Sequence, residues 1–174
     1  TIQDTYKCLD AKRMDEIAKI VNSALYVDIY AIGHNENIAQ NFKQKMLNIG
    51  KIVNCPSAYY EQSLITLASN SDHVAIILSY SGAYWSSQLC EQLRKKQVPV
   101  ILVTRAGVKD EACDNVYHLF ISDHENLQNR ISQFSSHIAM QYIMDVLYGA
   151  IYNLNCTKNN HYIRKSMSYH VPNQ

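Results

Sequence analysis

Residues 72–84 have the sequence DHVAIILSYSGAY, in which a short apolar run ends abruptly in a polar turn. The five apolar residues 74–78 are too few for a buried helix and fit a central strand that is covered on both faces. The turn 79–82 then places two hydroxyls beside a glycine, just before the helix-like stretch 86–96. Hydroxyls and backbone N–H groups at a helix start can hold an anion such as phosphate. The pattern is equally consistent with serines that only cap the helix.

The composition describes one globular domain. The chain has 174 residues, of which 47% are hydrophobic and 18% are charged, and its formal net charge is +1. A chain of this length can bury one sizeable core, and nothing in it indicates two. Because the charge is close to zero and no basic stripe is visible, we do not expect this chain to bind nucleic acid by itself.

The cysteines and histidines indicate neither a disulfide framework nor a metal site. Five cysteines are widely spaced without a C-x-x-C pair, which is typical of reduced thiols in a cytoplasmic protein. The seven histidines include no pair at helical i, i+4 spacing, so we expect no metal and no cofactor. No signal peptide or bilayer-spanning run is present, and we expect no membrane contact. Since the chain begins at Thr1 without an initiator methionine, we expect a piece of something longer.

Apolar periodicity predicts alternating helices and strands along the chain. Helices are expected over 10–24, 35–49, 57–68, 86–96 and 125–154. Asp10 is expected to be the N-cap of the first of these helices and Ser57 the N-cap of the third. Strands are expected over 27–32, 51–54, 74–78, 98–104 and 116–121. Such alternation predicts an α/β fold: a three-layer α/β/α sandwich with a central, mostly parallel five-stranded sheet. Ligands bind at the carboxyl ends of the strands in such sheets, where the turn after Gly33 and the turn 79–84 would both lie.

The last predicted helix is unusual because its second half, 140–154, leaves little polar face. A helix that is apolar nearly all round must be covered on every side, and a small domain rarely covers a peripheral helix so fully. We therefore expect 140–154 to form the interface of a homodimer or tetramer, with Asp145 making a structural or interface bond. The final residues, 155–174, show no periodicity and are expected to form a C-terminal tail after a domain of residues 1–154.

Three motifs resemble those of the SIS (sugar isomerase) domain family. The sequence SYSG at 79–82, after an apolar strand, resembles the signature S-x-S-G, and AIGHN at 31–35 looks like the family's first turn, G-x-G-x-S. The sequences SSHIA at 135–139 and IMDVLY at 143–148 are similar to the S-S-R-I-A…I-D-V-L-Y helix of RpiR-type transcription regulators. This last motif separates regulators from enzymes better than S-x-S-G does. The resemblance covers roughly 9–154.

The resemblance implies the phosphosugar-sensing effector and dimerisation domain of an RpiR-type transcriptional regulator, which would reach DNA only through an N-terminal helix-turn-helix domain absent from this chain. In this family the two serines of S-x-S-G grip the phosphate, so the ligand-binding residues implied here are Gly33, His34, Asn35, Ser79, Ser81, Gly82 and Tyr84. The sequence departs from the family pattern at four positions. Ala31 stands where the family has glycine, Asn35 where it has serine, Tyr84 where it has threonine and His137 where it has arginine.

Two other functions stay open. Solitary SIS domains of this size can isomerise sugar phosphates, and aldose–ketose isomerisation needs a base to move a proton between neighbouring carbons. The candidate bases are Glu61, His124 and Glu125, although Glu61 also fits a helix start and the other two also fit a solvated loop. The domain could also be a dimerisation module alone. We expect a regulatory domain without catalytic residues.

Overall fold

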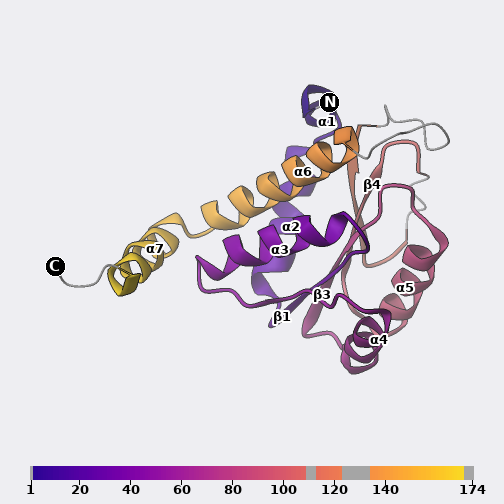
Figure 1. Ribbon diagram of the computed structural model, residues 1–174, viewed down its shortest axis with the longest axis horizontal. Coiled ribbons are helices and arrows are strands. Elements are labelled where there is room, and N and C mark those ends of the chain that lie inside the picture. Colours follow the sequence, from indigo (N-terminus) through magenta and orange to yellow (C-terminus); the bar gives the residue numbers. More distant parts are fainter. Residues whose placement is uncertain (1, 109–112, 123–133, 171–174) are drawn as a thin grey trace.

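The computed structural model describes residues 2–108, 113–122 and 134–170 (Figure 1). The helices in this part of the chain are α1 (Ile2–Lys7), α2 (Ala11–Ser23), α3 (Asn35–Leu47), α4 (Tyr59–Ala68), α5 (Tyr84–Lys95), α6 (Phe134–Asn153) and α7 (Cys156–His170). The strands are β1 (Tyr26–Tyr30), β2 (Val53–Asn54), β3 (His73–Leu78), β4 (Val100–Arg105) and β5 (Val116–Ile121). All five predicted strands are therefore present.

The strands form one parallel sheet in the order β2-β1-β3-β4-β5. Strand β3, the apolar run of the opening motif, lies at its centre, where Ile76 is paired with Ile29 on one side and Ile101 on the other. These three side chains are at most 1% exposed, as expected for parallel strands that are covered on both faces. The predicted α/β fold with a parallel five-stranded sheet is confirmed.

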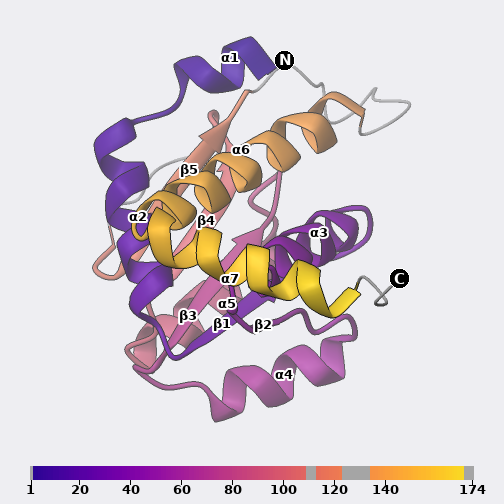
Figure 2. The ribbon, with the colours of Figure 1, turned by 90° about the vertical axis from the view of Figure 1, so that its left-hand side faces the viewer.

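Helices cover both faces of the sheet (Figures 1 and 2). Alternate side chains such as Ile76 and Ile101 belong to one core cluster, which also contains residues of α2, α3 and α6. The side chains between them, such as Ile77 and Leu102, belong to a second cluster with residues of α4 and α5. The molecule is therefore the three-layer sandwich that the sequence predicts.

The predicted helix caps differ in outcome. Asp10 caps α2, because its carboxylate accepts hydrogen bonds from the backbone N–H groups of Lys12 and Arg13 at 3.0 and 3.2 Å. Ser57 does not cap α4, whose N-cap is Ala58, and that part of the prediction is wrong. The backbone N–H of Ser57 instead donates to the carboxylate of Glu61 at 3.2 Å, so the acidic side chain satisfies the donor that precedes the helix.

Helix α6 is covered by its own chain. It contacts α1, α2, α3, β5 and α7, and the side chains of Leu147 and Ile151 are fully buried. The expectation that a second subunit must cover this helix is therefore wrong at these positions, because α2 and α3 already cover them. Asp145 makes the expected structural bond, accepting from the Lys45 ammonium at 2.5 Å and from the Gln141 amide at 2.8 Å. The predicted start of this helix at 125 lies outside the described residues.

The C-terminal segment contains a helix, α7, where no regular element is expected from the sequence. Asn155 begins this helix, since its side-chain oxygen accepts from the Lys158 backbone N–H at 3.3 Å. Asn159 then donates to the Tyr152 carbonyl at 2.9 Å, near the end of α6. Most other side chains of α7 are exposed, which explains the missing apolar period.

Candidate functional site

Two strand-to-helix turns meet at the carboxyl edge of the sheet. The first leads from β1 to α3 and the second from β3 to α5, and β1 and β3 are neighbours in the sheet. The Asn35 side chain joins the turns, because its Nδ2 donates a hydrogen bond of 3.2 Å to the backbone carbonyl of Leu78. The structure thus brings the two predicted groups of site residues to one place.

The first turn is open to solvent. Gly33 has a φ of +62°, a left-handed conformation that glycine adopts without strain, and its carbonyl accepts from the Glu36 N–H at 3.1 Å. His34 is exposed and occupies the N-cap position of α3, where its side chain makes no capping hydrogen bond. The first N–H groups of α3 are therefore not capped by His34.

The second turn is tighter, and its two serines differ. Ser79 is only 4% exposed, and its hydroxyl oxygen accepts from the Ala83 backbone N–H at 3.3 Å. Ser81 is exposed. Gly82 has a φ of +62° and donates its N–H to the Ser79 carbonyl at 3.2 Å. Ser79 thus has a structural role through its hydrogen bond to Ala83, whereas the exposed Ser81 is available to a ligand.

The start of α5 resembles that of α3. Tyr84 is the first residue of α5, and its N-cap residue, Ala83, has no side chain that could cap the helix. The helices α3 and α5 therefore begin at neighbouring strand ends, and in both the N-cap residue makes no side-chain hydrogen bond to the helix. Because the N-terminus of a helix carries a partial positive charge and free N–H donors, this arrangement suits an anion.

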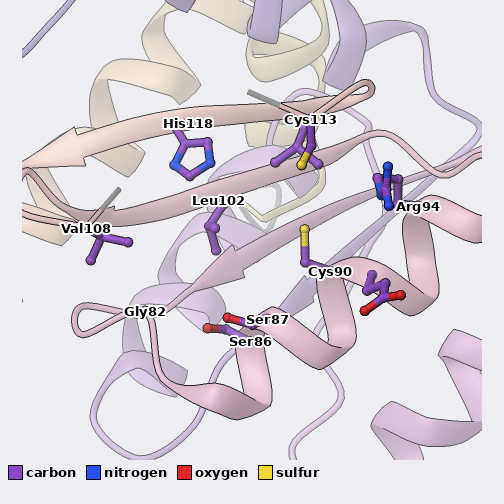
Figure 3. Close-up of a pocket in the computed structure, with 11 residues that line it drawn as sticks. Gly82, Ser86, Ser87, Cys90, Arg94, Leu102, Val108, Cys113 and His118 are labelled. Atoms are coloured by element: carbon purple, nitrogen blue, oxygen red, sulfur yellow. The ribbon is translucent and has the colours of Figure 1, made fainter. Parts of the chain in front are cut away.

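A cavity of about 470 Å³ lies beside the second turn, between α5, β4 and β5 (Figure 3). The described residues that line it are Gly82, Ser86, Ser87, Cys90, Glu91, Arg94, Leu102, Val108, Cys113, Val116 and His118. Gly82 is the member of the predicted site in this lining. The cavity therefore borders the turn on the side of β5, whereas the first turn lies on the side of β1.

The polar residues of this cavity come mainly from one face of α5, where Ser86, Cys90 and Arg94 recur every four residues, with Cys113 and His118 added from a distant part of the chain. Cys90 and Cys113 face the cavity from opposite sides (Figure 3). Burial, and secondarily the nearby Cys113, raises the pKa of the Cys90 thiol. A thiol with a raised pKa is a poor nucleophile at neutral pH. The cavity thus offers space and hydrogen-bonding groups rather than an activated thiol.

Of the three candidate catalytic bases, Glu61 lies within the described residues. Glu61 is exposed, and its carboxylate accepts the Ser57 N–H. His124 and Glu125 lie outside the described residues. Within the residues that the structure describes, no three His, Cys, Asp or Glu side chains are grouped so as to hold a metal ion. None of the described helices is long and apolar enough to cross a membrane.

The chain belongs to the SIS domain family, because the family's sequence profile matches residues 20–144, well over half of its length. This confirms the family that the motifs indicate. The same fold recurs in solved structures: the NanR protein of Vibrio vulnificus complexed with ManNAc-6P superposes with a TM-score of 0.82 at 17% identity, covering 98% of this chain and 65% of that one. The chain thus spans less than two thirds of the NanR chain.

Other solved structures extend the likeness to a domain of a transcription factor and to an isomerase. The sugar isomerase domain of an RpiR transcription factor from Sphaerobacter thermophilus has a TM-score of 0.78 at 10% identity, over 96% of this chain and 92% of that one. Phosphoheptose isomerase GmhA from Neisseria gonorrhoeae has a TM-score of 0.65 at 14% identity, over 86% and 89%. At these identities the similarity shows a shared fold, and this fold serves regulators and isomerases alike.

Proposed function

We propose that this chain is the phosphosugar-sensing effector domain of an RpiR-type transcriptional regulator. The observation that carries the proposal is the convergence of two helix starts on one sheet edge, joined by the bond between Asn35 and Leu78 and flanked by the exposed Ser81. Membership of the SIS family and the sequence S-Y-S-G at the second turn support the same site.

In the proposed complex, the phosphate lies at the start of α5. The exposed Ser81 hydroxyl and the first backbone N–H groups of α5 donate to its oxygens. Ser79 contributes as well, because a hydroxyl that accepts one hydrogen bond from Ala83 still has a proton to donate. Gly82 and Tyr84 shape the turn and the helix start. The first turn, through Gly33, His34 and Asn35, faces the sugar.

The proposed regulatory role includes partners outside this chain. The domain would act in the cytoplasm, as a homodimer or tetramer, without a metal or cofactor. It would control a helix-turn-helix domain that precedes it in the whole protein, and DNA would be contacted only there. In this role the ligand changes the arrangement of the associated domains, because a ligand shifts an equilibrium only by binding one state better than another.

A sugar phosphate isomerase is the alternative function, since the fold is shared with phosphoheptose isomerase. Among the candidate bases, Glu61 already accepts the Ser57 N–H at the start of α4, where a carboxylate favours the helix N-terminus. This hydrogen bond favours a structural role for Glu61. We propose that the chain binds sugar phosphates without converting them.

Calorimetric titration with hexose 6-phosphates, N-acetylhexosamine 6-phosphates, pentose 5-phosphates and the unphosphorylated sugars tests the proposal. We expect binding that requires the phosphate, that is lost in Ser81→Ala and that is retained in Ser87→Ala. Ser87 is the matched control because it is also an exposed serine near the start of α5 but lines the cavity of Figure 3. Loss in Ser87→Ala alone would move the site to that cavity.

The same titrations separate a sensor from an enzyme. NMR spectra of each bound sugar phosphate, recorded over time with the protein, should show no new isomer. Conversion of an aldose phosphate to its ketose would contradict the sensor function and support the isomerase function. No binding of any sugar phosphate would contradict both functions and leave association of copies as the role of the domain.

A further inference from the structure

Helix α4 has an inverted polarity. Its two buried residues are polar, since Gln62 and Thr66 are each 5% exposed. Its large exposed apolar side chains, with exposed fractions of 66%, 75%, 48% and 72%, are Tyr59, Tyr60, Leu64 and Leu67. A surface helix ordinarily buries its apolar stripe against the core and turns its polar side to water. Ile65 is the large apolar residue of α4 that packs on the core, so the four exposed ones do not serve the packing of this helix on the domain.

Hydrogen bonds of buried polar side chains, together with the packing of Ile65 on the second core cluster, attach α4 to the domain. The Gln62 amide donates to the carbonyls of Ala31 and Pro56 at 3.0 and 3.2 Å. The Thr66 hydroxyl lies 3.3 Å from the Tyr30 hydroxyl oxygen and donates to the Gln62 carbonyl at 2.8 Å. Because these buried polar groups are satisfied, the inverted orientation of the helix is specified rather than accidental. The apolar side chains on the outer side are left to contact something else.

We propose that the outer face of α4 pairs with the same face of a second copy of this chain. This surface, here called the α4 surface, consists of Tyr59, Tyr60, Leu64 and Leu67. Spacings of four and three residues put Tyr60, Leu64 and Leu67 on one stripe of the helix. Figures 1 and 2 show α4 at the periphery of the molecule, where a second copy can approach.

The stripe suits a two-fold axis. Leu64 lies near its middle, so two α4 helices packed antiparallel place Leu64 against Leu64 and Tyr60 against Leu67 of the partner. Such an isologous contact uses the same residues on both copies and closes after two subunits. An unrelated partner would need a complementary surface of its own, whereas the second copy already has one.

Charge and area favour the second copy as well. The helix carries one charged side chain, Glu61, and its carboxylate is bonded to the Ser57 N–H, so the faces meet without a row of like charges. The exposed parts of the four side chains amount to roughly 500 Å². This matches the apolar share of a standard homodimer interface, which is about 65% of about 800 Å² per subunit.

The α4 surface also borders the proposed ligand site, and this part of the inference rests on the proposed function. Gln62 bonds to Ala31, which lies in the chain just before Gly33 of the first turn. Tyr59 and Trp85 line one groove between α4 and α5, and Trp85 follows Tyr84 at the start of α5. A partner copy on α4 would therefore touch the elements that carry both turns, which gives ligand binding a route to the association of subunits.

Sedimentation velocity without ligand tests the pairing on the 174-residue chain. We expect the unchanged chain to sediment as a dimer and the double variant Leu64→Glu, Leu67→Glu to sediment as a monomer. Leu64 is 48% and Leu67 72% exposed within one chain, so the far-UV circular dichroism should stay the same, while the melting temperature should fall with the lost association. The matched control is Leu25→Glu, which changes a leucine that is 69% exposed and lies between α2 and β1, and this variant should remain a dimer.

A second variant keeps the pairing testable if the double variant does not fold. Tyr60→Lys changes the most exposed residue of the surface, at 75%, and should also give a monomer. A monomeric unchanged chain, or a dimer that persists in both variants, would overturn the proposal. Since no sugar phosphate is present, either result leaves the proposed sensing function to be judged by its own titration.

Discussion

The side-chain amide of Asn35 donates a hydrogen bond to the backbone carbonyl of Leu78, and this 3.2 Å contact connects the first residue of α3 to the last residue of β3. The two turns of the candidate site are thereby held in one arrangement before any ligand binds. The SIS family has serine at this position of the first turn, and a shorter serine side chain would not span the gap in the same way. Asn35 is thus a positioning residue as well as a candidate ligand contact.

We predict that Asn35→Ala weakens both stability and sugar phosphate binding. The bond to Leu78 is one partly buried hydrogen bond, so its loss should lower the free energy of unfolding by about 1 kcal/mol. Urea denaturation measures the first effect and calorimetry the second. Asn37→Ala, at an exposed position of the same helix, is the control and should change neither. Unchanged binding in Asn35→Ala would remove the first turn from the ligand site.

Gly82 is predicted to resist substitution. A Cβ at this position would lie 3.0 Å from the Val108 side chain, and the φ of +62° is strained for any residue with a side chain. Gly82→Ala should therefore lower the free energy of unfolding by about 1–3 kcal/mol. Gly149→Ala provides the contrast, because nothing lies within 4 Å of a Cβ there and alanine favours a helix interior by about 1 kcal/mol. Equal effects in thermal melts of the two variants would contradict this account.

The fold was predictable to the extent that its signals are local. The run 74–78 is fully buried, so its apolar character alone identified the central strand. The covering of α6 was not predictable, because it depends on α2 and α3, which lie far away in the sequence. Helix α7 was missed because side-chain amides of Asn155 and Asn159 fix it rather than an apolar stripe.

Part of the candidate site could also be predicted from the sequence, and part could be found only in the structure. The motif S-Y-S-G identified the second turn, because two hydroxyls and a left-handed glycine are encoded within four residues. The motif does not reveal that Ser79 is buried and bonded to the Ala83 N–H whereas Ser81 is exposed, because this difference arises from the three-dimensional packing of the turn. The cavity of Figure 3 lies between one face of α5 and residues of β4, β5 and the loop at Cys113, and this juxtaposition of distant segments is not encoded in any one motif.

A buried acidic side chain supports the sheet at its other end. Asp28 is 1% exposed, and its two oxygens lie 2.6 Å from the His73 Nδ1 and 2.7 Å from the Asn54 amide. His73→Ala leaves one oxygen of this buried carboxylate without its hydrogen bond, while Asn54 still donates to the other, so the free energy of unfolding should fall by about 1–3 kcal/mol. His34→Ala, at an exposed histidine, should leave it unchanged. Similar urea midpoints for the two variants would show that Asp28 does not depend on His73.

The contrast between α4 and α6 gives the last prediction. Leu147 is fully buried against its own chain, whereas Leu64 of the α4 surface is 48% exposed. Leu147→Asp therefore loses the burial of a core leucine, which costs about 2–5 kcal/mol, and also places a charge in the core. Because a domain of this size has a free energy of unfolding of about 5–15 kcal/mol, we expect Leu147→Asp to be unfolded or insoluble.

Leu154→Asp separates a core effect from an interface effect. Leu154 follows α6 and is 38% exposed, so this variant should fold and keep the melting temperature nearly unchanged. Circular dichroism and sedimentation velocity on both variants provide the comparison. A folded, monomeric Leu147→Asp protein would contradict the burial of α6 by α2 and α3 and would place the subunit interface on that helix. An unfolded Leu147→Asp protein beside a folded, monomeric Leu64→Glu, Leu67→Glu protein would assign α6 to the core and α4 to the interface.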